Sequence, residues 1–380
     1  KQLGAQLSSV KNKIIIQGVD GRFTQSSQPL FLANAGTAVR SLTAVLATQP
    51  FSSIITGNKR MQERPLKDLI QALKKAGVTV QSPTGCPPVI IQGPLLTGST
   101  SIKGDVSSQY VSALLMAAPL AKGPFSIHIK GKLTSRPYVD MTIDIMKKFG
   151  VTIHAKKSQF LVQPQKYKAR TYHVEGDASS ATYPLALTAL HGNKITITNL
   201  NNSSKQADML FLDILKKMGC RVTKTTKSIS VQGPKHLQPL RTINLNKMPD
   251  AAMTVAILCA FAKGKSKLTG LANLRVKETD RLTALSNELT KIGVKVVEGK
   301  DFLTIDGDPE NLHGGIIETY NDHRMAMCFA IVGSRIPNIH IRNSECVQKT
   351  YPTFWKELKH WGISTKKTPF KKYPNIVLAG

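Results

Sequence analysis

The stretch KKFGVTI at residues 147–153 recurs along the chain and decides the fold. It is typical of a helix that ends at a glycine and is followed directly by a strand. A glycine after a helix adopts the left-handed conformation without steric cost, and Lys in the last turn complements the helix dipole. Similar stretches recur at intervals of 73, 73, 69, 74 and 69 residues. Their glycines are Gly4, Gly77, Gly150, Gly219, Gly293 and Gly362.

A second series of predicted helices runs in phase with the first. These helices are apolar nearly all round, so we expect them to be buried. Most begin at Asn, Ser or Asp, which cap a helix by accepting a backbone N–H. They open at Asn34, Ser107, Ser179, Asp250 and His323, the last with Asp322 before it. A repeat of about 70 residues is longer than the 20–50 residues of most solenoid repeats, and it predicts a closed, pseudo-symmetric α/β assembly.

The first glycine has an unusual position in this pattern. Gly4 ends a helix whose body would begin about a dozen residues before Lys1, by the register of the other copies. We therefore expect the chain to lack most of its first repeat.

Composition limits the classes of protein that fit. With 380 residues, 41% apolar and 20% charged, the chain can bury a sizeable core in two or three domains. No apolar window is long enough for a membrane helix, and no secretory signal opens the chain. Five scattered cysteines without a C-x-x-C pair indicate reduced thiols in the cytoplasm, and neither a disulfide scaffold nor a zinc site.

The charge is strongly positive, since 52 basic and 23 acidic residues give a net charge of +29. Such a charge suggests nucleic-acid binding, but the lysines are spread along the whole length and aromatic residues make up only 6%. A lysine-rich solvated surface fits better, with anionic small substrates as a second possible cause.

Basic residues recur before the glycine-terminated helices. A cation is unfavourable at the positive end of a helix dipole, so five in register suggest that an anion binds there. The alternative for any one of them is a chance position in a basic chain. These residues are Arg64, Arg136, Lys205, Lys277 and Lys349.

The stretch NLRVKETDRL at 273–282 concentrates charge. At helical spacing Lys277 and Arg281 share a face, and Glu278 lies between them. This arrangement suits an anionic substrate bound beside a carboxylate that transfers a proton. The alternative is an exposed helix with oppositely charged residues at i,i+4 spacing.

Other polar residues at the N-termini of the predicted apolar helices can be explained by structural roles alone. Taken singly, Asp250 and the pair Ser107–Ser108 are N-caps. His323 is a structural hydrogen-bonding residue, and no second His stands at metal-ligand spacing.

Several motifs together resemble the 3-phosphoshikimate 1-carboxyvinyltransferase (5-enolpyruvylshikimate-3-phosphate synthase) family. The resemblance extends from about Gly4 to Lys349 and beyond. The motifs are LANAGTAVRSL, RMQERP, GDVSSQYVSALLMAAPLA, SRPYVD, EGDASSATY, PDAAMTVA, LRVKETDRL and TYNDHRMAM.

The resemblance implies an α/β fold of two domains, an inside-out α/β barrel of about six βαβαββ repeats with the first incomplete. It implies domains of about 1–174 and 175–380, the first with shikimate-phosphate contacts and the second with catalytic carboxylates and phosphoenolpyruvate contacts. The implied reaction transfers the enolpyruvyl group of phosphoenolpyruvate to the 5-hydroxyl of shikimate 3-phosphate and releases phosphate. The family needs no metal or organic cofactor, and we expect a cytoplasmic monomer with no nucleic-acid or membrane partner.

Site residues follow from the matching motifs. The resemblance implies that Asp250 accepts a proton and Glu278 donates one. The implied contacts of shikimate 3-phosphate are Ser107, Ser108, Gln109, Ser135, Asp250, Asn273 and Lys277. The implied contacts of phosphoenolpyruvate are Gly36, Arg64, Gln109, Arg281, Arg324 and Lys349.

The chain departs from the family pattern in places. The family's N-terminal Gly-Ser-Lys-Ser segment, with its catalytic Lys, is not in this sequence. Ser41 stands where the family usually has Pro and Ala33 where Gly is common, so we expect a shifted phosphoenolpyruvate pocket and weaker binding of glyphosate. Arg136 replaces a common Lys, which keeps the charge but changes the hydrogen-bond geometry.

Two alternatives remain open. The related enolpyruvyl transferase that acts on UDP-N-acetylglucosamine shares the fold, but SSQ, RVKETDR and YNDHRMAM favour the shikimate enzyme, and the reactive loop Cys of that family has no counterpart here. A basic nucleic-acid-binding protein would show a clustered basic face and a steep salt dependence of binding.

Overall fold

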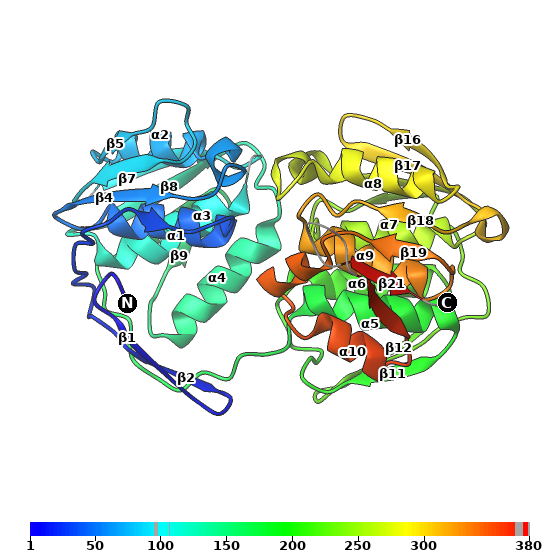
Figure 1. The fold of residues 1–380 in the computed structure, drawn as a ribbon. Coiled ribbons are helices and arrows are strands. Elements are labelled where there is room, and N and C mark those ends of the chain that lie inside the picture. Colours follow the sequence, from blue (N-terminus) through cyan, green and yellow to red (C-terminus); the bar gives the residue numbers. More distant parts are fainter. Residues whose placement is uncertain (95–97, 106, 369–374, 379–380) are drawn as a thin grey trace. The chain divides into compact units, whose positions relative to one another are not determined.

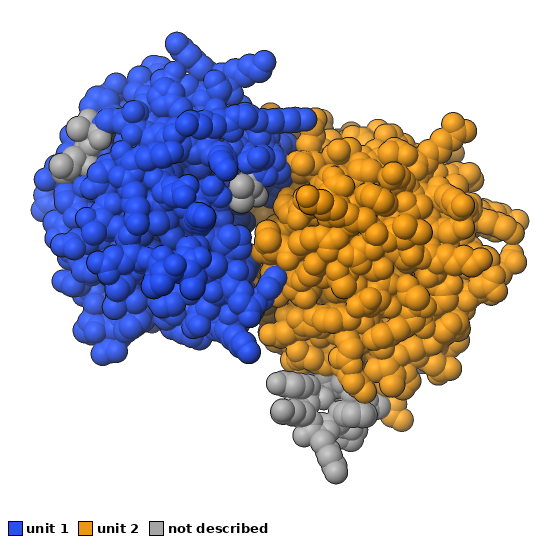
Figure 2. Space-filling view, turned by 90° about the horizontal axis from the view of Figure 1, so that it is seen from above, with its two compact units in different colours: residues 1–172 blue, residues 173–380 orange. Residues whose placement is uncertain are grey.

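The computed structural model describes residues 1–94, 98–105, 107–368 and 375–378. The chain forms two compact units, residues 1–172 and residues 173–380, coloured separately in Figure 2. The sequence predicts a boundary between 174 and 175, two residues further along. No helix in the described part of the chain is long and apolar enough to cross a membrane.

Most of each unit is built from one repeated arrangement of strands and helices (Figure 1). Repeat A comprises β3 (Leu30–Phe31), α1 (Gly36–Leu46), β4 (Ser52–Thr56), α2 (Lys67–Lys75), β5 (Thr79–Gln81) and β6 (Val89–Gln92). Repeat B comprises β7 (Gly98–Lys103), α3 (Ser108–Ala117), β8 (Phe125–Lys130), α4 (Arg136–Lys148), β9 (His154–Ala155) and β10 (Gln159–Val162). Both belong to unit 1.

Unit 2 holds three further repeats. Repeat C comprises α5 (Ala178–His191), β11 (Lys194–Ile197), α6 (Phe211–Lys217), β12 (Arg221–Lys224) and β13 (Ile229–Gln232). Repeat D comprises β14 (Thr242–Asn244), α7 (Ala252–Ala260), β15 (Gly264–Thr269), α8 (Arg281–Lys291), β16 (Lys295–Glu298) and β17 (Phe302–Gly307). Repeat E comprises β18 (Gly315–Ile317), α9 (His323–Gly333), β19 (Ile339–Ile341), α10 (Phe354–His360), β20 (Thr365–Thr368) and β21 (Asn375–Leu378).

Repeats A, B, D and E share one sheet topology. The first strand pairs parallel with the second, the fourth pairs antiparallel with the second, and the third forms the far edge beside the fourth. The four sheets therefore have the strand order first, second, fourth, third. This is the βαβαββ arrangement that the family resemblance implies.

Repeat C and the start of the chain differ from this pattern. Within the described residues, the sheet of repeat C has three strands, because residues 163–177 before α5 form no strand. That segment connects the two units, and the Gly176 N–H donates to the carbonyl of Asn199 at 2.8 Å. At the start of the chain, β1 (Gln6–Val10) and β2 (Lys13–Gln17) form an antiparallel hairpin after Gly4, as β5 and β6 do after Gly77.

The glycine prediction is confirmed. The backbone angle φ is positive at all six repeat glycines, with values of 86° to 99° at Gly4, Gly77, Gly150, Gly219, Gly293 and Gly362. A side chain at such a φ is strained, so the recurrence of glycine has a local cause.

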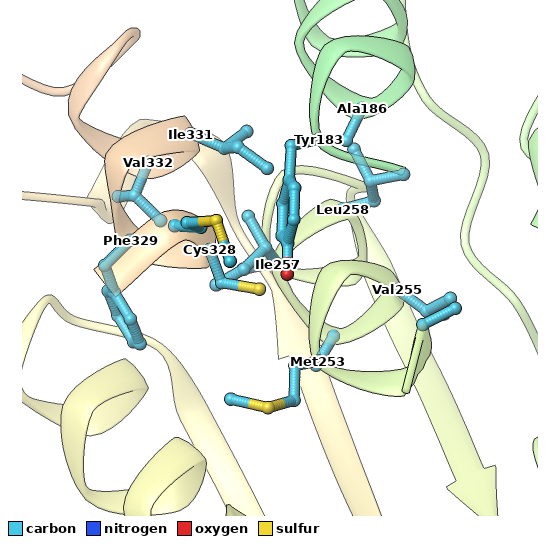
Figure 3. Close-up of a cluster of buried hydrophobic side chains, with 14 of the residues drawn as sticks. Tyr183, Ala186, Met253, Val255, Ile257, Leu258, Cys328, Phe329, Ile331 and Val332 are labelled. Atoms are coloured by element: carbon cyan, nitrogen blue, oxygen red, sulfur yellow. The ribbon is translucent and has the colours of Figure 1, made fainter. Parts of the chain in front are cut away.

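The in-phase apolar helices are buried, as predicted, although α1 is less so than the others. Every residue of α7 and α9 is buried, and most residues of α3 and α5 are. In unit 2, side chains of α5, α7 and α9 pack against one another, and Figure 3 shows Tyr183, Met253 and Cys328 among them. Thr254 Oγ1 lies 3.1 Å from Thr182 Oγ1 and 3.6 Å from Cys328 Sγ, which links equivalent turns of the three helices.

The parallel strand pairs determine where polar loops gather. The carboxyl ends of adjacent parallel strands meet at one edge of a sheet, and the segment after each strand leads into a helix N-terminus there. In repeat D, Asp250 follows β14, whereas Asn273 and Lys277 follow β15. In repeat E, Arg324 follows β18 and Lys349 follows β19.

Candidate active site

A network of charged side chains in unit 2 surrounds Arg281, the first residue of α8. The Arg281 side chain is only 2% exposed. Its Nε donates to Asp322 Oδ2 at 2.8 Å and its Nη2 donates to Asp322 Oδ1 at 3.2 Å, which is a bidentate pair. Its Nη2 also lies 3.0 Å from Glu278 Oε2, and its Nη1 lies 3.4 Å from Asp250 Oδ1. One guanidinium therefore connects three carboxylates.

Asp250 is bound by cations from three elements. Lys277 Nζ lies 3.4 Å from Oδ1, and Arg324 Nη2 from the start of α9 lies 3.2 Å from Oδ2. Burial by itself would raise the pKa of Asp250, but Arg324, Lys277 and Arg281 outweigh burial and hold that pKa well below its usual range. Asp250 is therefore a carboxylate at every physiological pH.

Glu278 is a second carboxylate of this network, and it contacts two cations. Its Oε2 accepts from Arg281, and its Oε1 accepts from Lys349 Nζ. The Glu278 side chain is 11% exposed, so it is desolvated but reachable. Asp250 and Glu278 thus lie on either side of one guanidinium, which places two candidate proton-transfer groups in one site.

Asp322 is the fully buried carboxylate of the network. It is completely buried, and it caps α9 by accepting from the Arg324 N–H at 2.9 Å. Burial would raise the pKa of Asp322, but the guanidinium of Arg281 lowers it by more, so the residue stays ionised. Asp322 therefore binds the Arg281 side chain and the Arg324 backbone with the same carboxylate.

Two local predictions for unit 2 are wrong. Asp250 is not an N-cap, because α7 begins after Ala251 and the Asp250 side chain turns to the cations of α8 and α9 instead. Lys277 and Arg281 do not share a helix face, because Lys277 has an extended conformation that separates a 3-10 helix (Ala272–Val276) from α8. They meet at Asp250 nevertheless, since both follow β15.

Two atoms of residues that the sequence analysis singled out are buried in unit 2 without a hydrogen-bond partner among the described residues. They are Oδ1 of Asn273 and Nδ1 of His323. A buried polar atom left unsatisfied costs roughly 1–3 kcal/mol. Asn273 is a predicted substrate contact, and its orphaned oxygen fits a group that a ligand would satisfy. His323 was predicted to be a structural hydrogen-bonding residue, but its Nδ1 forms no hydrogen bond among the described residues. Burial lowers the pKa of the His323 ring to about 4.

In unit 1, the N-terminus of α1 lies against Arg64. The helix begins at Gly36 after Ala35, two residues later than the predicted start at Asn34. Arg64 is buried, and its Nη1 donates to the carbonyl of Asn34 at 3.2 Å and to Asn34 Oδ1 at 3.0 Å. A Cβ atom at Gly36 would lie 2.5 Å from Arg64 Nη2. Glycine is therefore required for the guanidinium to reach the helix N-terminus.

The predicted serines lie at the carboxyl ends of the parallel strands β7 and β8. Ser107 caps α3, as predicted, by accepting from the Gln109 N–H at 3.3 Å, and Ser108 is buried in the first turn. Ser135 precedes α4 in the left-handed conformation with φ of 53° and is also buried. The Thr134 N–H donates to the Gly104 carbonyl at 2.7 Å, which ties the Ser135 loop to the end of β7.

Arg40 was not among the predicted site residues. It lies on α1 and is buried, and its Nη1 donates to Gln109 Oε1. Gln109 Nε2 donates to Thr37 Oγ1 at 3.2 Å. Because Arg can only donate, the amide orientation of Gln109 is fixed. The sequence signal for this contact is an arginine inside the otherwise apolar helix sequence TAVRSLTAVL, because a buried arginine needs a hydrogen-bond acceptor.

Only three of the five cations predicted to bind anions lie in the clusters of polar side chains described above. Arg136 forms an i,i+4 ion pair with Asp140 at 2.8 Å, and Lys205 is exposed. Arg64, Lys277 and Lys349 belong to the clusters described above.

Comparison with known proteins agrees with this arrangement. The sequence model of the EPSP synthase (3-phosphoshikimate 1-carboxyvinyltransferase) family matches residues 1–358. A 3-phosphoshikimate 1-carboxyvinyltransferase of Tolumonas auensis is 44% identical over 365 residues, which are 93% of this chain and 84% of the relative. A chloroplastic 3-phosphoshikimate 1-carboxyvinyltransferase of Nicotiana tabacum is 43% identical over 371 residues, which are 92% of this chain and 71% of the relative.

A solved structure of the same family has a similar fold. An EPSP synthase from Acinetobacter baumannii superimposes with a TM-score of 0.77 at 26% identity, and the match covers 94% of this chain and 85% of the other. The mixed α/β fold with several sheets agrees with the enolpyruvyl transferase fold expected from the sequence. The chain belongs to the EPSP synthase (3-phosphoshikimate 1-carboxyvinyltransferase) family.

Proposed function

We propose that this chain transfers the enolpyruvyl group of phosphoenolpyruvate to the 5-hydroxyl of shikimate 3-phosphate and releases inorganic phosphate. The observation that carries the proposal is the pair of carboxylates, Asp250 and Glu278, joined by Arg281 and faced by Lys277, Arg324 and Lys349. Two strongly anionic substrates need fixed cations to approach each other, and the reaction needs a base and an acid close together.

The first step adds the alcohol to the enol. The 5-hydroxyl oxygen attacks C2 of phosphoenolpyruvate while its proton goes to Asp250. Glu278, which takes up a proton from solvent once the substrate anions offset Arg281 and Lys349, donates that proton to C3, which becomes a methyl group. In the second step the Glu278 carboxylate takes a proton back from C3, the C2–O bond breaks with its electron pair on the departing phosphate, and the double bond forms again. The proton held by Asp250 leaves with the phosphate, so both carboxyl groups return to their starting states. Each positioned acid or base contributes about 10²–10⁴-fold to the rate.

The ion pairs of Asp250 explain how such a weak base could act. Three cations stabilise its charge and lower its basicity. Anionic groups of phosphoenolpyruvate bound to Arg281 and Arg324 would offset those cations, so the pKa of Asp250 would rise when the substrate arrives. Asp250 and Glu278 thus bind the same cations that we propose for the substrate anions.

Unit 1 would supply binding contacts. We propose that Ser107, Ser108 and Ser135 hold the phosphate of shikimate 3-phosphate, and that Gly36 and Arg64 contact phosphoenolpyruvate. Buried hydroxyls beside helix N-termini and a buried guanidinium are suitable donors for anions. Gln109 would contact both substrates, and Asn273 and Lys277 would contact shikimate 3-phosphate. A cytoplasmic monomer without metal or organic cofactor remains our prediction from the sequence.

Phosphate release tests this proposal directly. Phosphoenolpyruvate would be supplied with and without shikimate 3-phosphate, and separately with UDP-N-acetylglucosamine as acceptor. We expect release that requires shikimate 3-phosphate. Release that requires the sugar nucleotide in place of shikimate 3-phosphate, or no release from folded protein that carries the upstream Gly-Ser-Lys-Ser segment, would contradict the proposal.

A further inference from the structure

Helix α8 carries a second buried acidic residue that the reaction does not use. Glu288 lies seven residues after Arg281, which is two helical turns or about 10 Å along the same face. Its side chain is completely buried, and Arg281 is buried as well. A carboxylate buried without compensation would be costly, so its partners indicate what it does.

Those partners belong to the segment between β18 and α9. Glu288 Oε2 accepts from the Glu318 N–H at 3.1 Å, and Oε1 accepts from the Tyr320 hydroxyl at 2.7 Å. Lys291 Nζ lies 2.8 Å from both carboxylate oxygens and compensates the charge. Glu288 therefore binds one end of the segment, while Arg281 binds Asp322 at its other end.

The segment has a backbone that needs such support. Tyr320 and Asn321 are both in the left-handed region, with φ of 52° and 54°. Non-glycine residues there cost on the order of 1–3 kcal/mol each and persist where their surroundings hold them. The turn is closed by the Asp322 N–H, which donates to the Thr319 carbonyl at 2.8 Å. This turn sets the direction in which the Asp322 carboxylate points.

We propose that Glu288 is a positioning residue, which fixes the Glu318–Asp322 turn against α8 and thereby orients Asp322 and the Arg281 guanidinium for the anionic substrate. The inference rests on the proposed function for the identity of that substrate. Its geometric part, that α8 holds the turn at two points, stands on the contacts alone.

Three variants separate positioning from charge and from plain stability. Glu288→Gln keeps both hydrogen bonds, because its amide oxygen accepts from the Glu318 N–H and its amide nitrogen donates to the Tyr320 oxygen. Glu288→Leu removes both hydrogen bonds, and Tyr320→Phe removes one of them. Tyr167→Phe is the matched control, since it removes a hydroxyl that donates to the Met116 carbonyl in unit 1.

The measurements are KM for phosphoenolpyruvate, kcat and hydrogen–deuterium exchange of residues 318–324. We expect Glu288→Leu to raise KM by about tenfold or more, with a smaller change in kcat, and to speed exchange in the turn. Tyr320→Phe should raise KM less. Glu288→Gln and Tyr167→Phe should stay near the wild type in both KM and exchange.

Each result is decisive. Normal KM and exchange in folded Glu288→Leu, or a Glu288→Gln variant as impaired as Glu288→Leu, would overturn the positioning role. If Glu288→Leu does not fold, Tyr320→Phe decides by the same two measurements. A wild-type protein without turnover would instead contradict the proposed function, and the exchange data alone would then test the positioning role.

Discussion

The two units hold their buried arginines in different ways. In unit 2, Arg281 is bound by Asp322, Glu278 and Asp250, and Arg324 by Asp250. In unit 1, the acceptors described for Arg64 and Arg40 are the neutral oxygens of Asn34 and Gln109.

This difference separates two kinds of chemistry. A neutral acceptor leaves the charge of Arg40 undiminished, so the α1 region of unit 1 is suited to holding an anion. Carboxylates beside cations reduce the net charge but provide groups that accept and donate protons. We infer that variants at the α1 N-terminus of unit 1 change substrate binding, whereas variants of the carboxylates Asp250 and Glu278 of unit 2 change the chemical step.

The largest effect should come from the carboxylates of unit 2. Asp250→Ala and Glu278→Gln should each lower kcat by about 10²–10⁴-fold, because each removes a positioned base or acid. Binding of both substrates, measured by calorimetry, should persist. Asp144→Asn in unit 1, which breaks an i,i+4 ion pair with Lys148, is the control and should stay near the wild type. Near-normal kcat in either site variant would contradict its assigned role.

A smaller effect, confined to binding, should come from Gly36→Ala. The added Cβ would lie 2.5 Å from Arg64 Nη2 and would displace the guanidinium. We expect KM for phosphoenolpyruvate to rise by about tenfold or more, with a lesser change in kcat, in steady-state kinetics. Gly18→Ala is the matched control, since its Cβ would contact nothing within 4 Å. A fall in kcat at unchanged KM would break the proposed division between the units.

The two serines at α3 should differ from each other. Ser108→Ala removes a buried hydroxyl, so we expect KM for shikimate 3-phosphate to rise by about tenfold with little loss of stability. Ser107→Ala also removes the N-cap of α3 and should lower the free energy of unfolding by about 0.5–2 kcal/mol. Denaturant unfolding and steady-state kinetics measure the two effects. Equal stability of the two variants would show that the cap contributes little.

The smallest expected effect is at Ser41, inside α1. A proline there would remove a backbone donor and alter the helix turn that follows Gly36. We expect Ser41→Pro to change the inhibition constant of glyphosate a few-fold, toward tighter binding. An unchanged constant would count against a shifted phosphoenolpyruvate pocket.

Local sequence signals predicted the repeated framework well. A glycine that ends a helix depends on neighbouring residues, and all six repeat glycines have the expected positive φ. The caps at Ser107 and Asp322 are likewise local. The burial of α7 and α9 follows from their composition, because they carry few polar residues beyond their first turns.

Contacts between distant segments were harder to predict from the residues themselves. Asp250 looks like a cap in its own segment, and its ion pairs come from Lys277, Arg281 and Arg324 in other elements. The family resemblance placed it in the site, while the local pattern did not. Glu288 gave no signal, because only the fold brings α8 beside the segment after β18.

Deuterium incorporation tests the central claim most directly. If Glu278 protonates C3 to give a methyl group, a reaction in D₂O must place deuterium in the methylene group of the product. We predict this incorporation in the wild type only when both substrates are present. At saturating substrate Gly36→Ala should incorporate deuterium at a rate near that of the wild type, and Glu278→Gln should do so about 10²–10⁴-fold more slowly. A product free of deuterium from an active wild-type enzyme would contradict the addition–elimination mechanism and the role of unit 2 in it.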